Sequence, residues 1–315
     1  MAASAILALT DPYEHQRGLQ AVDMEIVVTA AGNYRAELKG LRFNQLWMQR
    51  SSQNLPFIGH ANLHPNRAVV GFLAHDRQLP IGIFGAEICR GEICCLAVRD
   101  EYHIRTSGES CWASMSLSPD DLAAAGRILL GHDTDWPGRR LIQPPPHLML
   151  KLLNLHQAAC DLATTAPDIL AQPEVSKALE QALVLALVTC LSDNAALTST
   201  RGHVGRTTVM RKFEELIEAE PDTPLYLIDI CDKIGVTSRT LRLHCQEQLG
   251  MGPHRYLWLR RMTLARRRLM RTEPNATTVT DIAMGYGFGE LGRFAVQYHT
   301  LFGETPSETL RHPAR

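Results

Sequence analysis

The 315-residue sequence lacks the patterns that mark membrane-spanning and exported proteins. Its longest nearly pure apolar run, ALVLALVTCL at residues 182–191, has about half of the ~20 residues that cross a bilayer. No basic region opens the N-terminus, so we expect a soluble cytoplasmic protein without export and without a membrane partner. Aromatic residues make up only 6% of the chain, but hydrophobic residues reach 45%, which is enough to fill sizeable cores.

The cysteines show neither a disulfide framework nor a metal-binding spacing. There are eight of them, with no C-x-x-C pair, and several lie in apolar segments, which is typical of reduced thiols buried as small hydrophobes. Cys94 and Cys95 are adjacent, so they point to opposite faces if their segment is a strand. We therefore expect no metal and no cofactor.

The charge of the chain is nearly balanced overall but unevenly distributed. The formal net charge is −1. Residues 201–315 hold 17 Lys and Arg against 13 Asp and Glu, whereas residues 1–200 hold 15 against 20. The basic charge is thus concentrated in the C-terminal third, where we look for contacts with an acidic partner such as nucleic acid.

The first two thirds of the chain divide into a strand-rich and a helical part. From residue 21 to residue 125, short segments of period-two alternation are separated by Gly or charged turns, which predicts an antiparallel sheet curled into a barrel or sandwich. Residues 126–191 contain a proline run and two amphipathic helices. The second helix is apolar around most of its circumference, so it packs on the barrel or forms a dimer interface.

The last third is helical and contains an internal repeat. Residues 192–208 are small and polar, as in a linker, and residues 209–311 carry a helical pattern with short Gly- or Pro-containing loops. DICDKIGV from Asp229 and DIAMGYGF from Asp281 align at an offset of 52, which places Gly235 on Gly287. Each unit predicts a short helix closed by Gly, an apolar plug, and a second helix: a helix-turn-helix.

The repeat also decides how GFGELG at residues 287–292 is interpreted. Its Gly-x-Gly-x-x-Gly spacing occurs in dinucleotide-binding folds, where a buried strand feeds the glycines. Here the preceding residues have helical spacing, and no βαβ unit follows. We therefore predict that Gly287 ends a helix with a positive φ, as Gly235 does.

With these motifs, residues ~208–311 resemble the DNA-binding region of AraC/XylS-type transcription regulators. The resemblance rests on ICDKIGVTSRTLRLHCQEQLGMGPHRYL, WLRRMTLARRRLM, VTDIAMGYGFGELGRF and LFGETPSE. The preceding part resembles, more weakly, the cupin-like barrel and helical pair that sense an effector in many such regulators. The implied architecture is α+β and multidomain: a β-barrel effector domain at 1–125, a helical region at 126–191 that could dimerise, a linker at 192–208, and an all-α DNA-binding domain at 209–311.

The resemblance implies double-stranded DNA as partner, with a small-molecule effector, RNA polymerase and a second copy of the chain as further expected partners. Second helices of helix-turn-helix units enter the major groove. We expect base contacts from Ser238, Arg239, Thr240 and Arg242 in the first unit, and from Glu290, Leu291, Arg293 and Gln297 in the second. Contact with phosphate alone is the alternative for the two arginines of the first unit. Phosphate contacts are expected from Arg260, Arg267 and Arg268 of the joining helix, although some arginines of that helix must be solvated or paired.

An effector cavity requires apolar walls with a few polar groups. The candidates are Trp47, Phe57, His60, Phe72, His75, Glu101, His103 and Trp112. Metal-bearing cupins use a closely spaced H-x-H pair, which this chain lacks. Two other functions stay open: a constitutive DNA-binding regulator whose barrel only dimerises or contacts polymerase, and a cupin-type enzyme. We expect the chain not to be an enzyme.

Overall fold

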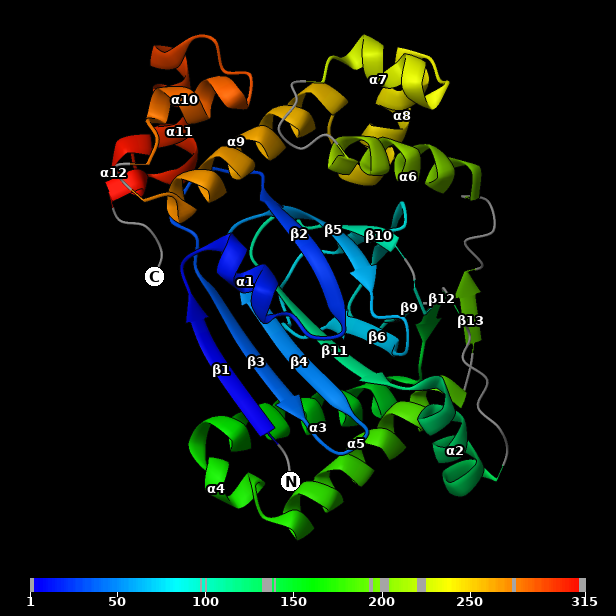
Figure 1. The fold of residues 1–315 in the computed structure, drawn as a ribbon. Coiled ribbons are helices and arrows are strands. Elements are labelled where there is room, and N and C mark those ends of the chain that lie inside the picture. The colour runs from blue at the N-terminus through cyan, green and yellow to red at the C-terminus, as the bar shows by residue number, and fades with distance from the viewer. Residues whose placement is uncertain are drawn as a thin grey trace.

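Two antiparallel sheets lie face to face in the N-terminal domain, with helices on both outer sides (Figure 1). The computed structural model describes residues 3–96, 98–99, 101–131, 138, 140–192, 195–198, 204–219, 225–273 and 276–311. The larger sheet has the order β1-β3-β4-β11-β6-β9-β12-β13 and the smaller one β2-β5-β10-β7-β8. Period-two alternation gives each strand one face toward the space between the sheets and one face outward.

The strands of the larger sheet are β1 (Ala3–Leu9), β3 (Ala36–Arg42), β4 (Trp47–Gln53), β6 (Ala68–Leu73), β9 (Ile93–Leu96), β11 (Ser110–Leu117), β12 (Arg140–Gln143) and β13 (Ala195–Thr198). Those of the smaller sheet are β2 (Val22–Val28), β5 (Phe57–Leu63), β7 (Ile81–Ile83), β8 (Ala86–Ile88) and β10 (Glu101–Arg105). A short helix, α1 (Pro12–Gly18), connects β1 to β2. The predicted antiparallel β domain is thus confirmed, as two facing sheets.

Four helices cover the outer face of the larger sheet: α2 (Pro119–Leu130), α3 (Pro146–Thr165), α4 (Pro167–Leu170) and α5 (Pro173–Ser192). The Ser118 hydroxyl accepts a hydrogen bond from the Asp121 amide, 3.0 Å, and caps α2. Leu183 and Leu187 of α5 are buried in one apolar core with Met48, Phe72 and other residues of the sheet. Helix α5 is the second amphipathic helix of the sequence analysis, and this core confirms that one of its faces packs on the sheet.

Helix α5 also has the length and composition of a membrane-spanning helix, alone among the helices of the described residues. Because Leu183, Leu187 and Leu191 of this helix are buried in the core that it shares with the larger sheet, we assign α5 as a core helix of the N-terminal domain. Cys94 and Cys95 of β9 point to opposite faces, as predicted: the first lies in the core between the sheets and the second in the core under the helices. All eight cysteines are free thiols.

The C-terminal domain is all helical, as predicted, and packs on the outer face of the smaller sheet (Figure 1). It consists of α6 (Val204–Ala219), α7 (Leu227–Ile234), α8 (Ser238–Leu249), α9 (Pro253–Arg271), α10 (Val279–Gly285), α11 (Leu291–Phe302) and α12 (Pro306–Arg311). Val27 and Ile58 of the smaller sheet belong to the same apolar core as Phe213 and Tyr256. The two domains therefore share buried surface.

Three segments differ from the sequence-based expectation. The first strand, β1, and the helix α1 precede the region in which strands were predicted. Strand β13 and the start of α6 lie within 192–208, the segment predicted as a linker, and the rest of that segment is largely outside the described residues. Strand β13 pairs with β12, a long-range contact that the small polar composition of this segment did not indicate.

Candidate nucleic-acid interface and interdomain contact

The two helix-turn-helix units repeat each other in their backbone hydrogen bonds. In the first, the Val236 amide donates to the Cys231 carbonyl, 3.0 Å. In the second, the Phe288 amide donates to the Ala283 carbonyl, 2.9 Å. Gly235 and Gly287 have φ of 73° and 78°, so both take the left-handed conformation that favours glycine. The prediction for Gly287 is confirmed, and the dinucleotide-binding alternative is not supported, because α10 and no strand precedes it.

Helix α8 exposes one face at its N-terminal end. Arg239 and Arg242 are exposed, whereas Leu241 and Cys245 are buried in the core of the domain. The exposed Ser238 opens the helix. The half-buried Thr240 is tied to the helix cap, because its amide and hydroxyl both bond to the Thr237 hydroxyl.

Helix α11 exposes a less polar N-terminus. Glu290, Leu291 and Arg293 are exposed, Gln297 is half-buried, and Phe294 is in the core. No side chain caps the start of this helix. Both second helices therefore present their N-terminal residues to a partner, which is how a recognition helix reads base edges.

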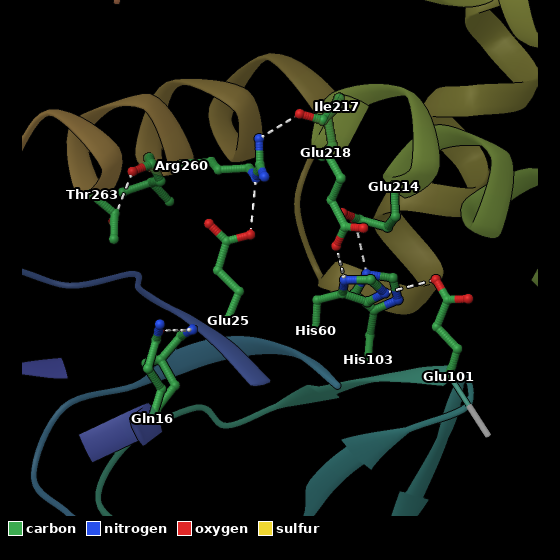
Figure 2. Close-up of polar contacts among 12 residues, drawn as sticks. Gln16, Glu25, His60, Glu101, His103, Glu214, Ile217, Glu218, Arg260 and Thr263 are labelled. Atoms are coloured by element: carbon green, nitrogen blue, oxygen red, sulfur yellow. Dashed lines mark hydrogen bonds and ion pairs between the residues drawn. The ribbon is translucent and has the colours of Figure 1, made fainter. Parts of the chain in front are cut away.

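The arginines of α9 divide between the partner-facing side and the N-terminal domain. Arg268 is exposed. Arg267 is half-buried, with its guanidinium 5.7 Å from the centre of the Tyr13 ring. Arg260 is 7% exposed and donates to Glu25 at 3.1 Å and to the Ile217 carbonyl at 2.9 Å (Figure 2). The prediction of a phosphate contact is wrong for Arg260 in this arrangement, because the residue belongs to the interdomain contact.

A cluster of ionisable groups joins the domains where α6 crosses the smaller sheet. We call it the histidine cluster: His60, Glu101 and His103 of the sheet with Glu214 and Glu218 of α6 (Figure 2). The two imidazole rings stack at 4.9 Å. His60 bonds to Glu101 at 2.8 Å and to Glu218 at 2.9 Å, and His103 bonds to Glu214 at 2.9 Å.

The cluster is held by charge. Burial disfavours protonation of His60, but hydrogen bonds to Glu101 and Glu218 and the nearby carboxylates outweigh it and raise the pKa of His60 to about 10. Burial likewise favours the neutral form of Glu214, yet His103 and the cationic neighbours hold the pKa of Glu214 below its usual value. The domains therefore meet through a protonated imidazole, the buried carboxylate of Glu214 and the more exposed carboxylates of Glu101 and Glu218.

A second ionic contact lies at the other end of α9. Arg266 bonds to Asp11, the residue that caps α1, and to Glu304 at 3.0 Å. The Arg271 guanidinium lies 4.1 Å from the centre of the Tyr13 ring, a cation–π contact with α1. The sequence did not reveal the contacts with Asp11 and Tyr13, because these residues are more than two hundred positions away from their arginine partners and nothing local marks them.

Only two of the predicted effector-pocket residues line the cavity between the sheets, Phe57 and Trp112. The structure places the other six predicted residues outside this cavity. His60, His103 and Glu101 belong to the histidine cluster, because alternation turns them to the outer face of the sheet. The Phe72 ring packs edge-on against His156 of α3, Trp47 contacts the guanidinium groups of Arg42 and Arg67, and His75 is exposed in a turn. No group of three or more metal-ligating side chains occurs among the described residues.

An exposed pair of helix-turn-helix units joined by one long helix defines a DNA-binding transcription regulator. Residues 230–312 match a family model described as "Helix-turn-helix domain". The probable thc operon regulatory protein of Rhodococcus erythropolis is 33% identical over 147 residues, which is 46% of this chain and 44% of that protein. The XylDLEGF operon transcriptional activator 2 of Pseudomonas putida is 30% identical over 124 residues, 39% of this chain and 77% of that protein. The chain belongs to the AraC/XylS family of transcription regulators.

Solved structures of AraC-like regulators are similar to this chain. The AraC-like transcriptional activator CuxR aligns over 98% of this chain and 100% of its own, at 12% identity and a TM-score of 0.41. An AraC-type regulator from Chromobacterium violaceum covers 35% of this chain and 96% of its own, at 28% identity and a TM-score of 0.32.

Several of the XylDLEGF activators, like the R. erythropolis protein, are matched over less than half of their length, for example 46%.

Proposed function

We propose that this protein is a sequence-specific DNA-binding regulator of transcription whose helices α8 and α11 enter successive major-groove segments. The proposal rests on one observation: the N-termini of both recognition helices are exposed, and the two helices lie at the two ends of α9. Helix α9 has 19 residues, so it is about 28 Å long, close to the ~34 Å repeat of the groove. One chain thus covers two groove segments, and a homodimer would cover two such sites. Contact with RNA polymerase belongs to the same proposal.

In this proposal the exposed side chains divide by role. Arg239 and Arg242 read guanine through their paired donors, supported by Ser238 and Thr240. The second helix reads less, because Leu291 offers only methyl contact to thymine and Glu290 only an acceptor to cytosine; Arg293 and Gln297 supply the remaining polar contacts. Arg267 and Arg268 contact phosphate, which positions the protein without reading sequence.

A pair of arginine variants tests this division. The full chain first selects its preferred duplex from a random pool, and that duplex is then titrated against its single-base substitutions. Arg239→Ala should lose discrimination at one base pair, by about 1–3 kcal/mol. Arg268→Ala should weaken all duplexes alike and flatten the salt slope by about 0.9. If the wild-type chain selects no preferred duplex, the function is refuted, and if the two variants behave alike, the assignment of roles is refuted.

We further propose that the regulator responds to a small molecule bound between the two sheets, where it is held and not chemically transformed. The two faces of strands β2, β5 and β10 support this proposal, because one face lines the cavity and the other contacts the DNA-binding domain. Met24, Phe57 and Ile104 face the cavity, whereas Glu25 and His103 on the same strands contact the DNA-binding domain. A ligand that displaces these strands would therefore change the interdomain contact.

Helix α1 gives a second connection of the same kind. His15 lines the cavity, and Asp11 at the start of this helix bonds to Arg266 of α9. These two connections favour a ligand-responsive regulator over a constitutive one, in which the N-terminal domain would have no influence on DNA binding.

Glutamate variants of α6 separate these two possibilities. Glu214→Gln keeps the shape of the side chain but removes the charge that pairs with His103. Glu215→Gln is the matched control, because its side chain is 54% exposed and pairs only within α6, with Arg211. Affinity for the selected duplex should change in the first variant and stay at the wild-type value in the control. Equal affinities in all three proteins would support the constitutive alternative.

A further inference from the structure

The cavity between the sheets is small and is lined by side chains from both sheets and from α1. Its volume is about 50 Å³, room for a few water-sized groups. A guest with a five-membered ring exceeds this volume, so Met24, which is flexible, unbranched and lies on one wall, must move aside to admit it. The geometry favours a compact ligand.

The lining of the cavity contains no charged side chain. Among the described residues that line it, none is Asp, Glu, Lys or Arg. His15 is its one titratable imidazole, and burial lowers the pKa of His15 to about 4, so the ring is neutral at physiological pH. Its two nitrogens bond to the Ser51 hydroxyl at 2.7 Å and to the Tyr34 hydroxyl. A charged guest would therefore be buried without a counter-charge.

The two sheets contribute walls of different polarity. The larger sheet turns Gln49, Ser51 and Gln53 of β4 and Ser114 of β11 inward. The smaller sheet turns apolar residues inward, among them Met24, Ile26, Phe57, Ile81 and Ile104. The wall formed by β4 and β11 offers uncharged hydrogen-bonding groups, and the opposite wall is mostly apolar, with Tyr102 and Thr106 as its hydroxyl-bearing residues.

Trp112 covers one side of this cavity by lying on a glycine. A Cβ built on Gly71 of β6 would fall 1.9 Å from Cζ2 of the indole, so the ring occupies the space that any other residue would fill. Trp112 is half-buried and lines the cavity. Its fluorescence is therefore a direct reporter of whether the cavity is filled.

We propose that the ligand of this cavity is a small, uncharged, mostly apolar molecule with one hydrogen-bonding group, such as an alcohol, ketone or amide. Its apolar part lies against the smaller sheet and its polar group against β4 and β11. Charged molecules are rejected because a buried charge without a partner costs several kcal/mol. This inference rests on the proposed ligand response and names the chemical class of the ligand.

Three probes of similar size test the class: cyclopentanol, cyclopentylammonium and cyclopentanecarboxylate. Each is titrated into the full chain while the thermal midpoint and the tryptophan fluorescence are recorded. Cyclopentanol should raise the midpoint and change the fluorescence, with an apparent Kd at least ~100-fold lower than either charged probe. In Trp112→Phe, the fluorescence change should disappear while the rise in midpoint remains.

Two substitutions locate the binding. Val69→Phe fills the cavity from β6 and should abolish the effect of cyclopentanol, whereas Leu79→Phe is the control, because Leu79 is 57% exposed outside the cavity. If circular dichroism shows Val69→Phe to be unfolded, Val69→Leu, which adds one methylene, should weaken binding instead.

Stabilisation by a charged probe as strong as that by cyclopentanol would overturn the proposal. So would the absence of any effect of cyclopentanol, or an effect that survives in both Val69 variants. DNA selection by the same protein preparation separates this failure from failure of the regulator function, since duplex binding does not require the cavity to be filled.

Discussion

Replacing His60 by Gln should remove a pH-dependent part of the stability of the full chain. In the folded protein His60 is 3% exposed and bonds to two carboxylates, which raises its pKa to about 10. In the unfolded chain its pKa is about 6.5. The folded state therefore binds the proton more tightly, and the resulting stability is fully present below pH 6.5 and is lost as the pH rises toward 10.

The magnitude follows from the difference between these pKa values. A shift of about 3.5 units corresponds to at most ~5 kcal/mol, since each unit is 1.36 kcal/mol. Glu218 is 44% exposed and Glu101 28% exposed, so solvent screens part of the attraction and about 2–3 kcal/mol remains. Gln at this position keeps a donor for one carboxylate but carries no charge.

The assay is urea unfolding of the full chain in half-unit steps from pH 6.5 to 9.5. We expect His60→Gln to be about 2–3 kcal/mol less stable at pH 6.5 and to approach the wild type toward pH 9.5. His75→Gln is the control, because His75 is exposed in a turn. A gap between His60→Gln and wild type that stays constant across this range would refute the argument that His60 is held protonated by the interdomain contact.

Three further substitutions should change stability in stated directions. Gly292→Ala should stabilise α11 by up to about 1 kcal/mol in thermal unfolding, because nothing lies within 4 Å of an added Cβ; a loss of DNA affinity in the same variant would indicate close backbone approach to DNA. Gly235→Ala should instead destabilise by about 1–2 kcal/mol, since its φ is 73°, and an unchanged midpoint would contradict this. Thr278→Ala removes the capping box of α10 and should cost about 1 kcal/mol, with Thr280→Ala as an exposed control on the same helix.

The structure of the DNA-binding domain could be predicted from the sequence because it is determined by local patterns. Gly235 and Gly287, the apolar plugs that follow them, and the 3.6-residue spacing of buried positions all act within a few turns of helix. The exposed positions of α8 follow from the same spacing, since a residue on the opposite face from Leu241 must face outward.

The structure of the N-terminal domain could be predicted from the sequence only in outline. Alternation predicted an antiparallel sheet, but which face of a strand looks inward depends on its pairing and on what covers it. His60 and His103 were therefore assigned to a pocket, although β5 and β10 turn them toward α6. The polar wall of the cavity was missed, because Gln49 and Ser51 resemble surface residues until a facing sheet encloses them.

By itself, the sequence determined the two helix-turn-helix units, their offset of 52 residues and the basic balance of the last third, because helix periodicity and glycine conformation are local properties. Only the tertiary structure placed Arg260 and Arg266 in the contact between the domains. The physical reason is that their partners Glu25 and Asp11 come from the other end of the chain. The partner of a buried charge depends on the tertiary structure and not on the residues next to it in the sequence.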